Sequence, residues 1–181
     1  MKKEFEMTNL GMLSYFLGIM FVIKENGTFM HQKKYANDVL RRFKMQDCNG
    51  ADTPSEAGLV LSKEGSDELV DSTTFKELVG SLRYLCNTRL DIAHSVGLVS
   101  RYMEKPRTSH YLAAKRILRY INETSELRLH YAKKQGGTEA DLIGFTDANW
   151  CGDKDDRKST YGYVFMINES PISWCSKKSK T

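Results

Sequence analysis

One aspartate stands where an apolar strand is expected to end. The run 142–150 opens with apolar residues and carries Asp147 towards its close, and a polar loop, 153–160, follows. Two more strand-like runs, 161–167 and 171–174, complete the pattern. Two-metal hydrolysis of a phosphodiester requires a cluster of carboxylates, and a lone aspartate cannot position two magnesium ions. We therefore expect no metal site, no cofactor and no enzymatic activity.

The loop that follows Asp147 offers other acidic residues, namely Asp153, Asp155 and Asp156. They lie in a connection rich in Gly, Asp and Lys, where acidic side chains usually support turns and solvation. We interpret these three residues as turn residues and keep Asp147 as the one acidic residue with a candidate site role.

Composition limits the function classes further. The chain has 181 residues, 40% of them apolar, and a formal charge of +4, which allows a packed core and a mildly basic surface without requiring a nucleic-acid partner. Its four cysteines lack the short paired spacing of zinc or redox motifs. The four histidines are scattered, and we interpret them as structural or surface residues.

The N-terminal apolar run, 10–23, follows Lys2 and Lys3 and could be taken for a secretion signal. However, Glu4 and Glu6 interrupt the basic start, no small-residue cleavage site follows, and the run is too short to cross a bilayer. Asn-Gly is a strong hairpin signal. The sequence favours a strand over 15–23, a turn at Asn26-Gly27 and a second strand over 28–31, with no membrane contact.

Apolar residues at helical spacing predict four helices, the first of which directly follows the hairpin. Thr88, with Asp91 three residues later, resembles a capping box at the start of one of them. Between residues 46 and 72 the periodicity fades, which indicates a long exposed linker. The expected elements are helices over 33–44, 73–87, 88–103 and 109–122, and a strand over 127–132.

Several of these segments resemble the Pol polyproteins of Copia-type retrotransposons. Asp147 in its strand, the loop ending at Thr160, and Ser173-Trp174 before Ser176-Lys177-Lys178 resemble the start of the ribonuclease H module. The resemblance implies that Asp147 is the first metal-binding carboxylate and that the other carboxylates lie beyond position 181. Leu90 departs from the family pattern, which usually has proline there. The segments that resemble the end of the reverse transcriptase are 3–11, 15–19, 78–85 and 113–120.

The resemblance implies an α+β fold in which a helical part, similar to a reverse-transcriptase thumb or connection, precedes a truncated ribonuclease H-like antiparallel sheet. We expect four parts. They are a strand hairpin and helix from the end of a reverse transcriptase (1–46), a flexible linker (47–72), a helical connection-like region (73–137) and the start of a ribonuclease H-like module (138–181).

Two functions without catalysis remain open. A basic helix face could bind the backbone of an RNA–DNA hybrid weakly, as expected of an inactive Pol remnant inside the cell. The residues expected to make these contacts are Lys105, Arg107, Lys115, Arg116 and Arg119.

The alternative function starts from the tetrapeptide Arg116-Ile117-Leu118-Arg119, which fits the Arg-x-Leu-Arg pattern of oomycete secreted effectors. The chain as a whole also resembles such effectors from downy mildews. That resemblance implies a secreted protein, without a clear signal peptide, that binds a plant host protein. In the nucleus or cytoplasm of the host cell it would suppress immunity or cell death. Of the two functions, the effector role is the working hypothesis.

Overall fold

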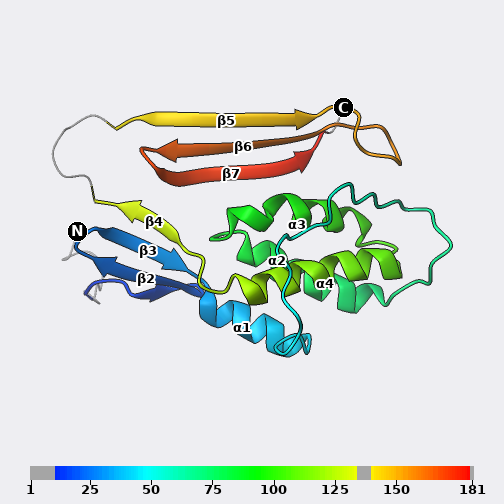
Figure 1. Ribbon diagram of the computed structural model, residues 1–181, viewed down its shortest axis with the longest axis horizontal. Helices are drawn as coiled ribbons and strands as arrows, with labels where there is room; N and C mark the ends of the chain where they lie inside the picture. Colours follow the sequence, from blue (N-terminus) through cyan, green and yellow to red (C-terminus); the bar gives the residue numbers. More distant parts are fainter. Residues whose placement is uncertain (1–10, 134–139, 180–181) are drawn as a thin grey trace, which may run out of the picture.

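The computed structural model describes residues 11–133 and 140–179, which form two antiparallel sheets and a group of helices (Figure 1). The N-terminal sheet has the order β1-β2-β3-β4, and the C-terminal sheet has the order β5-β6-β7. This arrangement confirms the predicted α+β class. The strands are β1 (Tyr15–Phe16), β2 (Ile19–Lys24), β3 (Gly27–His31), β4 (Leu129–Ala132), β5 (Leu142–Asn149), β6 (Thr160–Ile167) and β7 (Ser170–Lys178).

The predicted N-terminal hairpin is present as β2 and β3, which pair from Met20 opposite His31 to Lys24 opposite Gly27. Gly27 has a φ of 145°, and a Cβ there would lie 2.2 Å from the backbone oxygen of Tyr131 in β4, so only glycine fits. The single strand predicted over 15–23 was wrong. Leu17 and Gly18 both have positive φ, and this turn divides the segment into β1 and β2.

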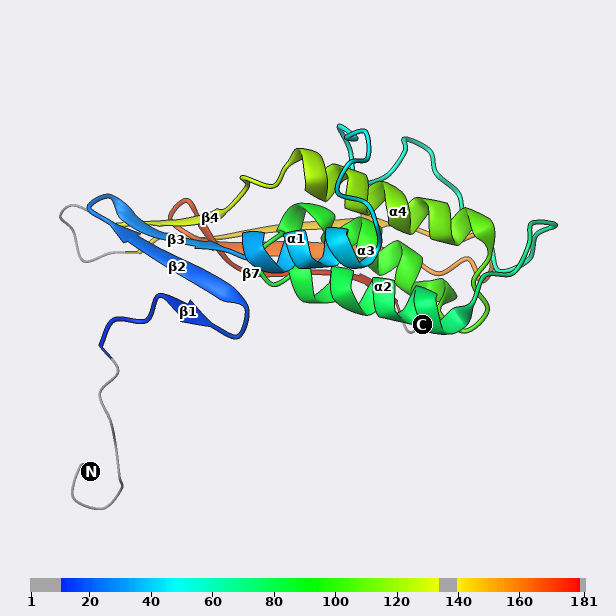
Figure 2. The same cartoon turned by 90° about the horizontal axis from the view of Figure 1, so that it is seen from below.

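The helices supply the core, and in a view from below the N-terminal sheet extends from one end of them (Figure 2). Apolar residues of α2 and α4 at three- and four-residue spacing are at most 1% exposed, among them Phe75, Leu82 and Leu118. Full burial of each such side chain stabilises the fold by about 2 kcal/mol. The α-helices are α1 (Lys33–Arg42), α2 (Ser72–Leu85), α3 (Ala93–Val99) and α4 (Thr108–Glu123).

The capping box predicted at Thr88 is absent, and this prediction was wrong. The Thr88 hydroxyl is buried and hydrogen-bonds the Gln32 side chain at 3.0 Å, while the Asp91 carboxylate accepts from Arg89 at 2.7 Å. Thr88 thus makes a tertiary contact and Asp91 a local one, and the predicted helix over 88–103 forms three shorter pieces. Two single 3₁₀ turns, η1 (Leu90–Ile92) and η2 (Ser100–Tyr102), flank α3.

Residues 43–71 contain no helix or strand, but this segment differs from the exposed linker that the sequence indicates. Ala51 and Leu61 are buried in it, and Leu69 makes an isolated antiparallel bridge to Arg107. Side chains of α4 also donate hydrogen bonds to backbone oxygens of this segment. The segment therefore packs along the helices.

The C-terminal sheet packs on the helices through β7, which continues four residues beyond the predicted end at Trp174 and contacts α3. The Trp174 indole N–H donates to the backbone oxygen of Cys86 at 2.9 Å. Strand β5, at the other edge, is exposed along its whole length. Among the described helices, none has the length and apolar content that crossing a bilayer requires.

Candidate functional site

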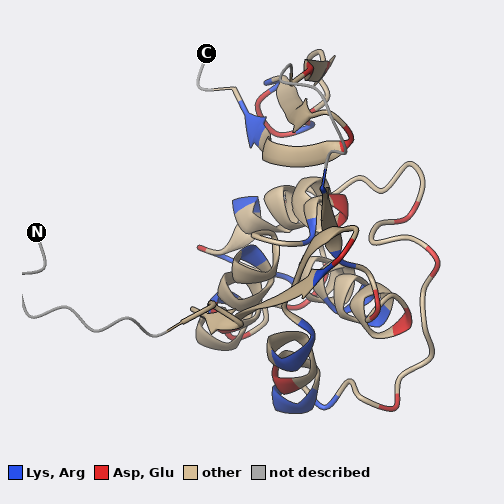
Figure 3. Ribbon diagram, turned by 90° about the vertical axis from the view of Figure 1, so that its left-hand side faces the viewer, with Lys and Arg blue, Asp and Glu red and all other residues tan. Residues whose placement is uncertain are grey.

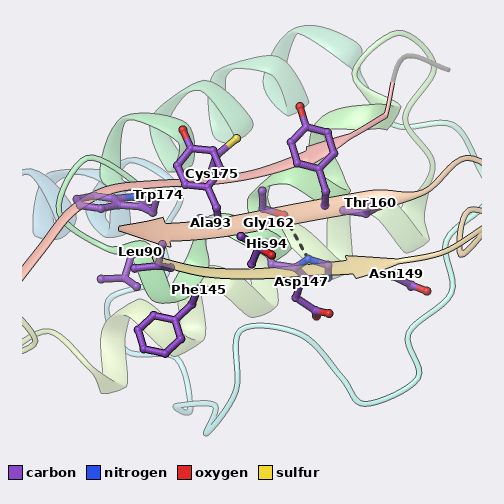
Figure 4. Close-up of a pocket in the computed structure, with 15 residues that line it drawn as sticks. Leu90, Ala93, His94, Phe145, Asp147, Asn149, Thr160, Gly162, Trp174 and Cys175 are labelled. Carbon is purple, nitrogen blue, oxygen red and sulfur yellow. Dashed lines mark hydrogen bonds between the residues drawn. The ribbon is translucent and has the colours of Figure 1, made fainter. Parts of the chain in front are cut away.

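Asp147 lies in β5 opposite Gly162 of β6. Its carboxylate is exposed and accepts the backbone N–H of Ala148 at 2.8 Å. Side chains alternate along a strand, so Asp147 shares a face with Phe145 and Asn149. Figure 4 shows Phe145, Asp147 and Asn149 along β5.

A cavity of about 390 Å³ lies between this face of the sheet and the segment formed by η1 and α3. Its apolar lining includes Leu90, Phe145 and Trp174 (Figure 4). Asp147 and His94 are among its polar lining residues, and the His94 Nδ1 lies 3.4 Å from the Ser176 hydroxyl. The site is thus a largely apolar hollow with a carboxylate at its edge.

Asp153 is the best-connected acidic residue beside this site. Its side chain is only 3% exposed, and its carboxylate binds Arg101 of η2 at 2.9 Å and Lys178 of β7 at 2.7 Å. Burial alone would raise the pKa of the Asp153 carboxyl. The hydrogen bonds from Lys178 and from the N–H groups of Asp155 and Asp156 outweigh burial and lower the pKa to about 2.

The other loop acids also have protein partners. The Asp155 carboxylate accepts from the Ser62 hydroxyl at 2.7 Å and from the Lys63 N–H, and Asp156 pairs with Lys178 at 2.7 Å. Within residues 11–133 and 140–179, no group of three or more His, Cys, Asp or Glu side chains could hold a metal ion. The carboxylates present near Asp147 therefore do not fit a two-magnesium centre.

The predicted basic face of α4 is occupied by the chain itself. Arg119 donates to the backbone oxygens of Asn49 at 2.7 Å and Gly50 at 2.9 Å. Arg116 pairs with Glu56 at 3.1 Å, and Lys115 stands 5.2 Å from the ring centre of Tyr111. The two arginines fasten the segment 43–71 to the helix.

The two remaining basic candidates differ from each other. Arg107 donates to the backbone oxygens of Lys63 and Asp67, whereas Lys105 is exposed in the connection before α4. The structure therefore does not bring the five predicted cations together as free donors on one surface.

The Arg-x-Leu-Arg tetrapeptide lies in the middle of α4. Ile117 is 1% exposed and Leu118 is fully buried, so the central residues belong to the core. Its outer residues are the arginines that hold the segment 43–71. Every residue of the tetrapeptide therefore has a role in the packing of this chain.

Comparison with known proteins decides the family. The profile of the family described as "Reverse transcriptase (RNA-dependent DNA polymerase)" matches residues 1–57. A retrovirus-related Pol polyprotein from transposon RE1 of Arabidopsis thaliana is 39% identical over 93% of this chain and 11% of the polyprotein. An uncharacterised mitochondrial protein of the same plant is 33% identical over the whole chain and 74% of its own length.

This chain belongs to the Copia-type Pol family. It spans only 11% of the RE1 polyprotein. A further relative of the Copia-type chain is the secreted RxLR effector protein 161 of Plasmopara viticola, which is 42% identical over 57% of this chain and 71% of that protein. No solved structure matches the chain.

Sequence reasoning missed two cations of this Copia-type chain. Arg101 and Lys178 lie far apart in sequence, yet both bind Asp153 and thereby join the sheet to the helices. The only available signal was Arg101 near the end of a predicted helix and Lys178 in a run of lysines, and neither pattern predicts a partner.

Proposed function

We propose that this chain is the part of a Copia-type Pol polyprotein that connects the reverse transcriptase to the ribonuclease H module. In this proposal the helices α2 to α4 are a connection-like region and β5 to β7 are the first strands of a ribonuclease H-like sheet. One observation carries the proposal: a chain whose first 57 residues match the reverse-transcriptase profile also holds an antiparallel sheet with Asp147 in its edge strand.

We further propose that the chain binds an RNA–DNA hybrid and does not cleave it. The acidic residues that could accompany Asp147 are engaged in ion pairs or backbone hydrogen bonds. Releasing Asp153 to bind a metal ion would leave the largely buried charge of Arg101 without its ion-pair partner, which is unfavourable.

The test uses the 181-residue chain and a fluorescent RNA–DNA hybrid with magnesium or manganese. We expect salt-dependent binding without cleavage of the RNA strand, and an Asp147→Asn variant that behaves like the unchanged chain. Magnesium-dependent cleavage that disappears in Asp147→Asn would overturn the proposal that the chain lacks catalysis.

A second candidate function is that of an effector that suppresses immunity or cell death inside plant cells. The identity of 42% to the secreted effector of Plasmopara viticola supports it. One observation argues against the effector function. A receptor could bind the whole tetrapeptide Arg116-Ile117-Leu118-Arg119 only if α4 unfolded, because Ile117 and Leu118 are core residues.

Expression in leaves challenged with a cell-death elicitor separates the two functions. The Pol function predicts undiminished cell death. Suppression of cell death by the unchanged chain, together with secretion of a tagged form, would establish the effector function. Comparing Arg116→Ala with Lys115→Ala would then show whether the tetrapeptide itself matters.

A further inference from the structure

A second groove, of about 370 Å³, runs between β7 on one side and α2, α3 and η2 on the other. Four cationic residues line it: Arg83 at the end of α2, Arg101 of η2, and Lys177 and Lys178 at the end of β7. None of the lining residues is acidic. The basic end of β7 is coloured blue in Figure 3. We call this feature the α3–β7 groove.

The four cations fall into two pairs with different roles. Arg101 and Lys178 bind Asp153, so their positions are fixed and their charges are compensated. Arg83 and Lys177 are exposed, and neither forms an ion pair or a side-chain hydrogen bond with any residue in the described part of the chain. Two exposed cations, one from α2 and one from β7, therefore line the groove without an ion-pair partner among the described residues.

The α3–β7 groove adjoins the cavity at Asp147. Ala93, Trp174, Cys175 and Ser176 line both hollows. A linear ligand held by Arg83 and Lys177 would therefore lie beside β7, next to the cavity that Asp147 lines. This position favours an extended polyanion that follows the strand over a compact anion held at one point.

We propose that the α3–β7 groove binds the phosphate backbone of a nucleic-acid strand, with Arg83 and Lys177 as the main contacts. The inference rests on the proposed function of hybrid binding and gives it a location away from α4, where Arg116 and Arg119 bind the chain's own segment. The Arg83 guanidinium can hold a phosphate through two parallel hydrogen bonds, and Lys177 acts as a point charge. Asn87, also exposed in the lining, adds a neutral amide donor. Such contacts read no base sequence.

The test compares two double variants of the 181-residue chain that remove equal charge. Arg83→Ala/Lys177→Ala removes the two free groove cations. Lys34→Ala/Arg42→Ala removes two exposed cations of α1, which lies on the far side of the helices from β7 (Figure 1). Binding of a fluorescent RNA–DNA hybrid is followed by anisotropy over a series of salt concentrations. Thermal unfolding of each variant shows that the fold is kept.

We expect the groove variant to bind the hybrid about tenfold more weakly, and its slope of log affinity against log salt to fall by roughly 2, because two phosphate contacts are lost. The α1 variant should keep a slope close to that of the unchanged chain. Equal losses in the two variants would overturn the groove assignment but leave hybrid binding intact. No binding by the unchanged chain would overturn both proposals. Displacement of the hybrid by poly-glutamate at equal charge concentration would assign the groove to acidic protein partners and overturn the inference.

Discussion

At the scale of single residues, Asp153 has the role that the sequence least indicated. We interpreted it as a turn residue, and it does accept the N–H groups of Asp155 and Asp156 within its loop. Its side chain is nevertheless 3% exposed and bound to Arg101 and Lys178. One carboxylate thus supports a turn and also joins three elements that are distant in sequence.

Asp153→Asn should lower the free energy of unfolding by about 3 kcal/mol, because removing one partner of a buried ion pair leaves the other charge uncompensated. Urea unfolding followed by circular dichroism measures the change. Asp52→Asn, at an exposed position in the segment 43–71, is the matched control and should have little effect. A loss in Asp153→Asn no larger than in this control would contradict the role of Asp153.

The two tryptophans offer a second comparison at the residue scale. Trp174 donates to the Cys86 backbone oxygen at 2.9 Å, whereas Trp150 is 84% exposed. Trp174→Phe should destabilise the chain by about 1 kcal/mol through loss of that hydrogen bond, and Trp150→Phe should be nearly neutral. Chemical denaturation of both variants tests this, and equal effects would show that the indole N–H contributes nothing.

At the scale of elements, α4 organises the segment that joins α1 to α2. Its buried side contributes Ile117, Leu118 and Ile121 to the core. On its outer side, Arg116 and Arg119 bind the side chain of Glu56 and the backbone oxygens of Asn49 and Gly50. Charged residues on the outer face of a helix usually suggest solvation or an external ligand, but here much of their hydrogen-bonding capacity is used within the chain.

Arg119→Ala should make residues 43–57 more sensitive to limited proteolysis, by about tenfold, because two hydrogen bonds from a charged donor contribute on the order of 1.5 kcal/mol to keeping the segment closed. Digestion with a low amount of protease, followed by mass spectrometry, locates and times the cut. Lys115→Ala, which removes the contact with Tyr111 and does not touch the segment's backbone hydrogen bonds to Arg119, should leave the rate unchanged. A common rate for both variants would show that Arg119 does not restrain the segment.

At the scale of the whole molecule, stability should depend on pH through two buried contacts. His110 is buried: its Nδ1 accepts the Arg107 N–H at 3.0 Å, and its Nε2 lies 2.9 Å from the Ser62 oxygen. Burial lowers the pKa of His110 below its ordinary value of 6.5, so the unfolded chain takes up the proton first. The contribution of His110 to the free energy of unfolding is therefore complete above pH 6.5 and declines as the pH falls below 6.5.

Asp153 adds a second decline at lower pH. Its pKa is about 2 in the folded chain against an ordinary value of 3.8, so its stabilisation is present above 3.8 and is lost as the pH falls towards 2. Denaturant midpoints measured from above pH 6.5 down to pH 2 should fall in two stages, and Asp153→Asn should make the second stage smaller. A variant curve parallel to that of the unchanged chain between pH 3.8 and 2 would contradict the assignment.

Local patterns in the sequence determined the elements of this protein. Three- and four-residue apolar spacing predicted the helices that became α1, α2 and α4, and Asn26-Gly27 predicted the β2–β3 hairpin, because periodicity and turn chemistry act over a few neighbouring residues. The motif around Asp147 likewise placed a strand correctly. The break between β1 and β2 was missed because Leu17 gives no sign of its positive φ.

Tertiary structure alone decided which charges remain free. Arg116, Arg119 and Asp153 resemble surface residues in the sequence, yet each is bound to a segment tens of residues away. Arg83 and Lys177, for which no sequence pattern predicted a ligand, stand without ion-pair partners among the described residues at the α3–β7 groove. Sequence spacing carries no record of such pairings, because the meeting of two distant side chains depends on how whole elements pack.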